Sequence, residues 1–188
     1  KSDQIIDYLE IYDGQNFKTV DDLELYKKVV GTDQVFDGVQ TENGDIWIGH
    51  FHQTPFVYKQ NNEVIVHDKF PGSSCRVLLA SQGNKVWTGG YNEICQHDGQ
   101  QWKIVHEQID NVCDMIEDRQ GKIWVATING VYCYNPNISN SWIHYTVKDG
   151  LVEDAEFIIP TTHNMLAIER ALKVAGARYV SPEGINLE

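Results

Sequence analysis

Gly121-Lys122-Ile123-Trp124-Val125-Ala126 is the third copy of a short phrase in this chain. Each copy begins at a turn, places an apolar residue before a tryptophan, and ends in a small residue. The two earlier copies are Gly44-Asp45-Ile46-Trp47-Ile48-Gly49 and Gly83-Asn84-Lys85-Val86-Trp87-Thr88-Gly89. The tryptophans at positions 47, 87 and 124 are 40 and 37 residues apart. An internal repeat of this length is typical of a four-stranded sheet that forms one blade of a β-propeller.

The residues before each tryptophan predict the first two strands of a blade, strands A and B. Phe36 and Cys113 stand eleven residues before their tryptophans, and Cys75 stands twelve before its own. The apolar stretches around these positions predict strand A. Strand B carries the tryptophan and follows a tight turn, where Gly and Asn adopt positive φ at low cost. The three turns are predicted at Asn43-Gly44, Gly83-Asn84 and Gln120-Gly121.

Polar turns after each tryptophan predict the hairpin between strands C and D. They are Gln60-Asn61-Asn62, Asp98-Gly99-Gln100 and Asn135-Pro136-Asn137. Residues 12–17 are similar to residues 97–102, so we expect the chain to open on strands C and D of an earlier blade. The predicted fold class is all-β, with propeller blades of four antiparallel strands that form a partial propeller or a fragment of a larger one. We expect one propeller-type domain over 1–188, with a blade remnant at 1–30, blades at about 31–70, 71–108 and 109–147, and a further blade at 150–188.

The last quarter of the chain leaves two interpretations open. Residues 165–177 contain good helix formers, which favours a helix followed by a short strand at 178–180. The period of the repeat favours a blade instead, with strand A at 156–159 and strand B at 165–168, where Leu166 replaces the tryptophan.

Composition excludes several classes of partner. The chain has 188 residues and a formal net charge of -12, which repels phosphate backbones, so nucleic acid is not expected as a partner. No apolar run is long enough to cross a bilayer, so we expect contact with a membrane only through segments outside this chain. No secretory signal opens the sequence, which predicts either a removed leader or a longer parent protein.

The four cysteines follow the repeat rather than a metal-binding pattern. Cys75, Cys95, Cys113 and Cys133 are 20, 18 and 20 residues apart, without a Cys-x-x-Cys pair, so no metal site is expected. We assign Cys75 and Cys113 to equivalent positions of strand A, and Cys95 and Cys133 to equivalent positions of strand C. Small side chains buried in the blades are the expectation, and a disulfide between blades stays open.

Catalytic motifs are missing from the sequence. It has no nucleophile elbow, no zinc-protease helix motif and no glycine-rich phosphate loop. We therefore predict no catalytic residues and no cofactor for this chain.

The stretch from Glu117 to Thr127 resembles the two-component regulator propeller repeat. Asn129-Gly130-Val131-Tyr132-Cys133-Tyr134 is similar to strand C of that family, and residues 144–151 are similar to its link into the next blade. The resemblance covers about residues 5–160. It implies a sensor region on the periplasmic or extracellular side of a bacterial membrane protein, typically a hybrid histidine kinase or a diguanylate cyclase. It also implies a small-molecule or glycan ligand, and either a homodimer or additional blades of the same protein.

In a propeller the B–C loops gather at one end of the blades, so residues far apart in sequence meet there. Aromatic, amide and imidazole side chains in these loops suit a sugar, which offers C–H faces and hydroxyl groups. The candidate ligand-binding residues are His50, Phe51, His52, Gln53, Tyr91, Asn92, Asn129 and, if the last blade exists, Glu169 and Arg170.

Two other functions stay open. A protein-interaction propeller predicts a rim of exposed aromatic residues and arginines. A propeller lyase or hydrolase predicts histidines and carboxylates that converge at one end of the blades.

Overall fold

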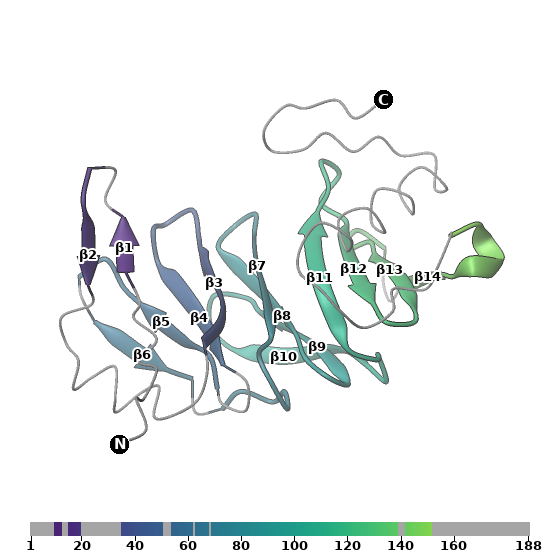
Figure 1. Ribbon diagram of the computed structural model, residues 1–188, viewed down its shortest axis with the longest axis horizontal. Coiled ribbons are helices and arrows are strands. Elements are labelled where there is room, and N and C mark those ends of the chain that lie inside the picture. The colour runs from purple at the N-terminus through teal and green to yellow at the C-terminus, as the bar shows by residue number, and fades with distance from the viewer. Residues whose placement is uncertain are drawn as a thin grey trace, which may run out of the picture.

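The computed structural model describes residues 10–12, 15–19, 35–50, 54–61, 63–67, 69–138 and 142–151 (Figure 1). Within these residues the strands form three four-stranded antiparallel sheets and one two-stranded sheet. The sheets stand side by side in chain order, as Figure 1 shows. The predicted all-β fold of four-stranded blades is therefore confirmed. The interpretations of residues 165–177 and of a blade at 150–188 concern residues that lie, apart from 150 and 151, outside the described part.

The strands follow the order expected for propeller blades. Blade 1 is β3 to β6, blade 2 is β7 to β10 and blade 3 is β11 to β14, and a 3-10 helix, η1, follows. The described elements are β1 (Glu10–Tyr12), β2 (Phe17–Thr19), β3 (Val35–Gln40), β4 (Ile46–His50), β5 (Phe56–Tyr58), β6 (Val64–Val66), β7 (Val77–Ser81), β8 (Lys85–Gly89), β9 (Glu93–His97), β10 (Trp102–Glu107), β11 (Val112–Glu117), β12 (Ile123–Thr127), β13 (Gly130–Tyr134), β14 (Trp142–Tyr145) and η1 (Val147–Asp149).

The first strands of the blades lie at the inner edge of the arrangement. Each sheet keeps its strands in chain order from one edge to the other, and β7 contacts both β3 and β11. The three strands A therefore converge, which is the radial packing of a propeller. This convergence brings the starts of β3, β7 and β11 together.

Local hydrogen bonds explain why the repeated phrase forms a hairpin. In blade 3 the Asp118 carboxylate accepts the backbone N–H groups of Gln120 and Lys122, each at 2.9 Å, and the indole N–H of Trp124, also at 2.9 Å. Gly121 provides the positive φ of 75° that the turn needs. In blade 2 the Ser81 hydroxyl accepts the indole N–H of Trp87 at 3.0 Å. The turn thus fixes the tryptophan that follows it.

Each tryptophan is buried: Trp47 and Trp87 lie between two sheets, and Trp124 packs with residues of its own blade and with Leu151 of the link that follows. Trp47, Trp87 and Trp124 are 4%, 2% and 1% exposed. Trp47 packs with Leu78 and Val86 of blade 2, and Trp87 packs with Met115 and Ile123 of blade 3. We call these two packed layers the first seam, between blades 1 and 2, and the second seam, between blades 2 and 3. The seams are the hydrophobic core of the described chain.

The strand register corrects the predicted equivalence of Cys75 and Cys113. Val39, Leu79 and Ile116 lie opposite the three tryptophans in the paired strands. Counted from these residues, the position of Phe36 and Cys113 falls on Arg76 in blade 2. Cys75 lies one residue earlier, in the link before β7, and is fully buried. The prediction was wrong because it matched residue types across a difference of one residue in spacing.

The same offset corrects the predicted equivalence of Cys95 and Cys133. Trp87 lies opposite Gln96, whereas Trp124 lies opposite Cys133. Because a shift of one residue turns a side chain to the other face of a strand, the two thiols face different layers. Cys95 packs in the first seam, and Cys133 packs with Trp124. All four cysteines are free thiols in the structure.

Small residues on strand B allow the next blade to approach. A Cβ atom on Gly49 would lie 2.6 Å from the carbonyl oxygen of Cys75, and one on Gly89 would lie 2.4 Å from Cγ1 of Val112. The Cys75 N–H donates to the carbonyl of His50 at 3.1 Å, and the Val112 N–H donates to the carbonyl of Gly90 at 3.0 Å. The start of each blade is therefore seated on the preceding strand B.

The first seam also holds two imidazoles. The rings of His67 and His97 each lie 4.8 Å from the ring of Trp47, and they lie 4.9 Å from one another. Burial lowers the pKa of His97, an effect that Asp98 opposes and Lys59 reinforces. The imidazole is therefore held in its neutral form, and its Nδ1 accepts the Gly99 N–H at 3.2 Å.

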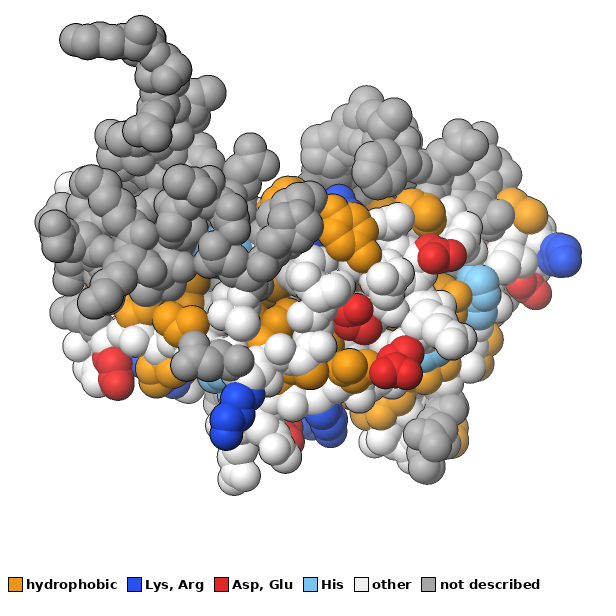
Figure 2. Space-filling view, turned by 90° about the horizontal axis from the view of Figure 1, so that it is seen from below, with side chains coloured by type: hydrophobic (Ala, Val, Ile, Leu, Met, Phe, Trp, Pro, Cys, Tyr) orange, Lys and Arg blue, Asp and Glu red, His pale blue; other side chains and the backbone are white. Residues whose placement is uncertain are grey.

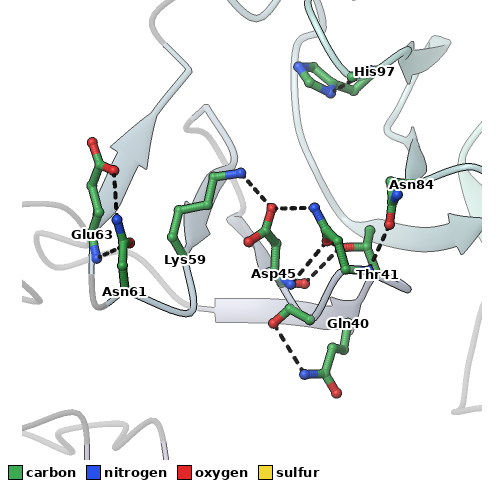
Figure 3. Close-up of polar contacts among 11 residues, drawn as sticks. Gln40, Thr41, Asp45, Lys59, Asn61, Glu63, Asn84 and His97 are labelled. Carbon is green, nitrogen blue, oxygen red and sulfur yellow. Dashed lines mark hydrogen bonds and ion pairs between the residues drawn. The ribbon is translucent and has the colours of Figure 1, made fainter.

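Polar residues close the first seam at the end where strands A and B turn (Figure 3). Lys59 forms an ion pair with Asp45, and the Asn43 side chain donates to the same carboxylate at 2.9 Å. The Asn43 backbone N–H donates to the Asn84 side chain at 2.8 Å, which joins the turns of blades 1 and 2. The polar side chains at this end of the first seam are thus engaged in contacts within the protein.

The acidic side chains do not gather in one patch on the face that Figure 2 shows, where they lie among apolar and neutral polar groups. Among the described residues, no group of three or more His, Cys, Asp and Glu is placed to hold a metal ion. No helix in the described part of the chain is long and apolar enough to cross a bilayer.

Replacing Gly89 with alanine tests the close contact of blades 2 and 3. The new methyl group would overlap Val112, so we expect Gly89→Ala to lower the free energy of unfolding by about 1–3 kcal/mol, measured by chemical denaturation. Gly38→Ala is the control, because its Cβ would meet the Trp47 carbonyl oxygen at an ordinary 3.6 Å. The cost of Gly89→Ala should shrink when Val112 is replaced by glycine, which removes the Cβ and both methyl groups that the new methyl group would meet, and equal costs in both backgrounds would contradict the close contact of the two blades.

Acidification tests the neutral imidazole in the first seam. Since the pKa of His97 is lower in the folded protein than its ordinary 6.5, the unfolded chain binds more protons as the pH falls through that value. The free energy of unfolding should therefore decrease between about pH 7 and pH 5. His97→Phe keeps the ring and should reduce this slope, to which His106, whose pKa burial also lowers, contributes the remainder. His144→Phe, which removes an exposed imidazole, should leave the slope nearly unchanged, and an equal effect of both variants would refute the assignment to His97.

Candidate ligand-binding site

The starts of the inner strands and the B–C loop of blade 2 form one group of side chains, which we call the Arg76 group. Its members are Phe36, Arg76, Tyr91, Asn111 and Cys113. Strand A begins, and strand B ends, at the same end of an antiparallel blade, so the strand starts and the B–C loops share that end. The group contains three residues at one repeat position and two from the loops beside them.

In blades 1 and 3 the shared position lies where strand A departs from regular pairing, whereas in blade 2 Arg76 directly precedes the regular ladder of β7 and β8. The ladder of β3 and β4 is irregular between Val35 and Asp37, and the ladder of β11 and β12 is irregular between Val112 and Asp114. Phe36 and Cys113 are the residues at these irregularities. A bulge of this kind re-aims a side chain out of the regular alternation. Repeats can thus place different side chains at one point without disturbing the seams.

Arg76 contacts members of the group from all three blades. Its guanidinium carbon lies 5.9 Å from the ring centre of Phe36 and 5.1 Å from that of Tyr91, which are cation–π distances. Its Nη1 atom donates to the Asn111 side chain at 3.4 Å. Burial raises the pKa of the Cys113 thiol, and the nearby Arg76 opposes that rise. The arginine therefore lies at the centre of the group.

Backbone hydrogen bonds hold the B–C loop of blade 2 in place. The carbonyl of Tyr91 accepts the Asn111 N–H at 2.9 Å, and the carbonyl of Asn92 accepts the Ile109 N–H at 3.2 Å. Asn111 has a positive φ of 38°, a conformation that asparagine tolerates better than most residues. The loop that carries Tyr91 and the link that carries Asn111 are thus fixed to each other.

Two half-buried carboxylates lie on the same inner strands. Burial raises the pKa of Asp37 and that of Asp114. The Asp37 carboxylate accepts the backbone N–H groups of Leu78 at 2.8 Å and Gly38 at 2.7 Å. Asp114 accepts the Met115 N–H at 2.8 Å. These oxygens are engaged by the backbone, and Asp37 ties blade 1 to blade 2.

The structure places the sequence-predicted residues in different surroundings. Tyr91 belongs to the Arg76 group, and the exposed Asn92 is its neighbour in the loop. Asn129 is exposed, and its side chain donates to Asp110. His50 is fully buried, with its ring 5.2 Å from that of Phe56. The remaining predicted residues, Phe51, His52, Gln53, Glu169 and Arg170, lie outside the described residues.

Sequence reasoning missed Phe36, Arg76, Asn111 and Cys113 as members of the site. The signal was present for three of them, because each stands eleven residues before a tryptophan. In blade 2 the match of Cys75 to Cys113 drew the comparison one residue away from Arg76. Asn111 has no such signal, since its role depends on the shape of the link.

Comparisons with known proteins agree with the repeat and the fold. The two-component regulator propeller model matches residues 107–129, so the third copy of the phrase is a repeat of this kind. No curated protein has a significantly similar sequence.

Solved structures with the same fold include extracellular domains of two putative hybrid two component systems. The extracellular domain of the putative hybrid two component system BT3049 from B. thetaiotaomicron matches 65% of this chain and 18% of its own length, at 17% identity and a TM-score of 0.55. That of BT4673 matches 74% of this chain and 20% of its own length, at 18% identity and a TM-score of 0.57. A virginiamycin B lyase from Staphylococcus aureus matches 74% of this chain and 45% of its own length, at 12% identity and a TM-score of 0.53. At these identities the likeness shows the fold, and this chain spans about a fifth of the two extracellular domains.

Substitutions of Asn111 separate its backbone role from its side-chain role. Asn111→Ala removes the amide and keeps a Cβ at positive φ, so we expect a loss of about 1 kcal/mol or more in the free energy of unfolding. Asn111→Gly also removes the amide but relieves the backbone, so its stability should stay near that of the parent protein. Denaturant titration of the three proteins measures both effects. Equal losses in the two variants would show that the backbone conformation is not the constraint.

Proposed function

We propose that this chain is part of the ligand-binding sensor region of a bacterial membrane signalling protein, and that it recognises a glycan or another small molecule. The repeat at 107–129 and the fold shared with two extracellular sensor domains support the module. The Arg76 group is the observation that carries the ligand-binding part of the proposal.

The composition of the Arg76 group favours ligand binding over packing alone. Phe36, Arg76 and Cys113 occupy one repeat position, yet they share neither size nor polarity. The tryptophans, in contrast, recur because each fills a seam. Phe36 is 41% exposed at the end of the blades, where a sugar ring can stack on its face. Tyr91 and Asn111 add hydroxyl and amide groups, which bind sugar hydroxyls.

The rest of the proposal concerns the parent protein. We infer a location on the periplasmic or extracellular side of the membrane. A membrane segment and a kinase or cyclase would lie outside this chain. Additional blades or a second copy would cover the outer sheet faces.

A protein-interaction role is the second candidate, and one observation favours it. On the outer strands β10 and β14 of blades 2 and 3, His106 stacks on Trp142 with ring centres 4.6 Å apart, and His144 stacks on Tyr132 of the neighbouring β13 at 4.0 Å. Ile143 beside them is 52% exposed. Aromatic and apolar residues on a rim are the composition of a protein-binding surface.

Calorimetry with a panel of glycans tests the sensor proposal. We expect at least one glycan to bind and Tyr91→Ala to weaken that binding about tenfold or more, because the variant removes a ring of the site. Gln100→Ala is the matched control, since Gln100 is exposed in the turn at the opposite end of blade 2. Silence across the panel, with a purified protein partner binding through Trp142 and His144, would replace the sensor proposal with the interaction role.

A further inference from the structure

Arg76 offers hydrogen-bond donors that the protein itself does not use fully. A guanidinium group carries five N–H donors in one plane. Within the described residues, Arg76 has one side-chain hydrogen bond, the 3.4 Å contact to the neutral amide of Asn111. Cation–π contacts with Phe36 and Tyr91 involve the faces of those rings and leave N–H groups for other partners.

Among the described residues, no carboxylate forms an ion pair with this arginine. The oxygens of Asp37 accept backbone N–H groups from Gly38 and Leu78. In the described chain the ion pair of Lys59 and Asp45 lies at the opposite end of blade 1, and Arg76 forms none. Within the part of the chain that the structure describes, this half-buried cation thus has no anionic partner, although the protein has a net charge of -12.

The surroundings of Arg76 also prepare it to bind. The two aromatic rings and the Asn111 amide restrict the side chain before a ligand arrives, which reduces the entropy lost on binding. A planar guanidinium matches a carboxylate with two parallel hydrogen bonds. The exposed ring of Phe36 lies next to this donor set and can stack on the sugar that bears the carboxylate.

We propose that Arg76 binds a carboxylate of the ligand, so that the protein recognises an acidic saccharide containing a uronic acid. This inference rests on the proposed ligand-binding function and adds the chemical class of the ligand. Phe36 and Tyr91 position the guanidinium group, and the side-chain oxygen of Asn111 accepts a hydrogen bond from its Nη1 atom. The charge of Arg76 supplies the preference over neutral sugars.

Paired sugars that differ by one carboxylate test the inference. We expect galacturonate and its oligomers to bind, in calorimetry, about tenfold or more tighter than galactose and its oligomers, and glucuronate likewise to exceed glucose. Arg76→Gln should remove this preference, and Arg76→Lys should keep part of it, because lysine retains the charge without the planar fork. Added salt should weaken binding of the acidic sugars more than that of the neutral ones.

Controls separate this result from general electrostatics and from loss of the fold. Lys103→Gln removes the same charge from an exposed position on β10 and should change neither affinity nor preference. The melting temperature of each variant shows whether it is folded, and Arg76→Lys serves if Arg76→Gln is unstable.

Each outcome decides between the two levels of the proposal. Tighter binding of acidic sugars that depends on Arg76 supports both. Binding of neutral sugars that Arg76→Gln leaves unchanged keeps the sensor function and overturns the carboxylate inference. Preference for acidic sugars that survives Arg76→Gln also overturns it, as does inorganic sulfate binding as tightly as galacturonate. Failure of every sugar overturns both levels.

Discussion

The burial of one indole ring per blade is the interaction on which the rest of this structure depends. A four-stranded sheet of about 35 residues cannot cover both of its apolar faces alone, so each blade is stable only against a neighbour. Replacing a buried tryptophan by alanine typically costs about 3–5 kcal/mol. Against a typical domain stability of about 5–15 kcal/mol, this is a large share. The ring must also be oriented, and Ser81 and Asp118 do so by accepting its N–H group.

The seams determine where a site can form. Glycines on strand B let the start of the next blade approach closely, and backbone hydrogen bonds lock it there. The inner strands converge as a result, and the side chains at their starts meet the loop of blade 2. Arg76, Phe36 and Tyr91 come together although they lie 40 and 15 residues apart in sequence. Packing of the seams thus places these side chains next to one another, and the side chains provide the groups that can bind a ligand.

Much of the fold follows from the sequence, because the repeated phrase combines a turn, a strand and a buried ring in one short stretch. The blades, their strand order and the buried tryptophans were predictable for this reason. The register of individual residues was less so: Cys75 and Cys95 were each misassigned by one residue, and a shift of one residue reverses the face of a strand. Of the five residues in the Arg76 group, only Tyr91 was among those predicted from the sequence. Arg76 was missed since its partners come from two other segments. The contact of Trp47 with His97 recurs as that of Trp87 with Tyr134, so this aromatic position does follow the repeat.

Positions at the start of strand A differ from those inside the seams in the substitutions that they tolerate. Trp87 and Gly89 are held by neighbours on both sides, so almost any replacement disturbs the fold. Phe36, Arg76 and Cys113 stand at one repeat position beside the inner strands, where the three blades carry an aromatic ring, a cation and a thiol. Single substitutions at this position can therefore change ligand specificity while the fold is kept. The architecture is thus well suited to evolve binding of new compounds.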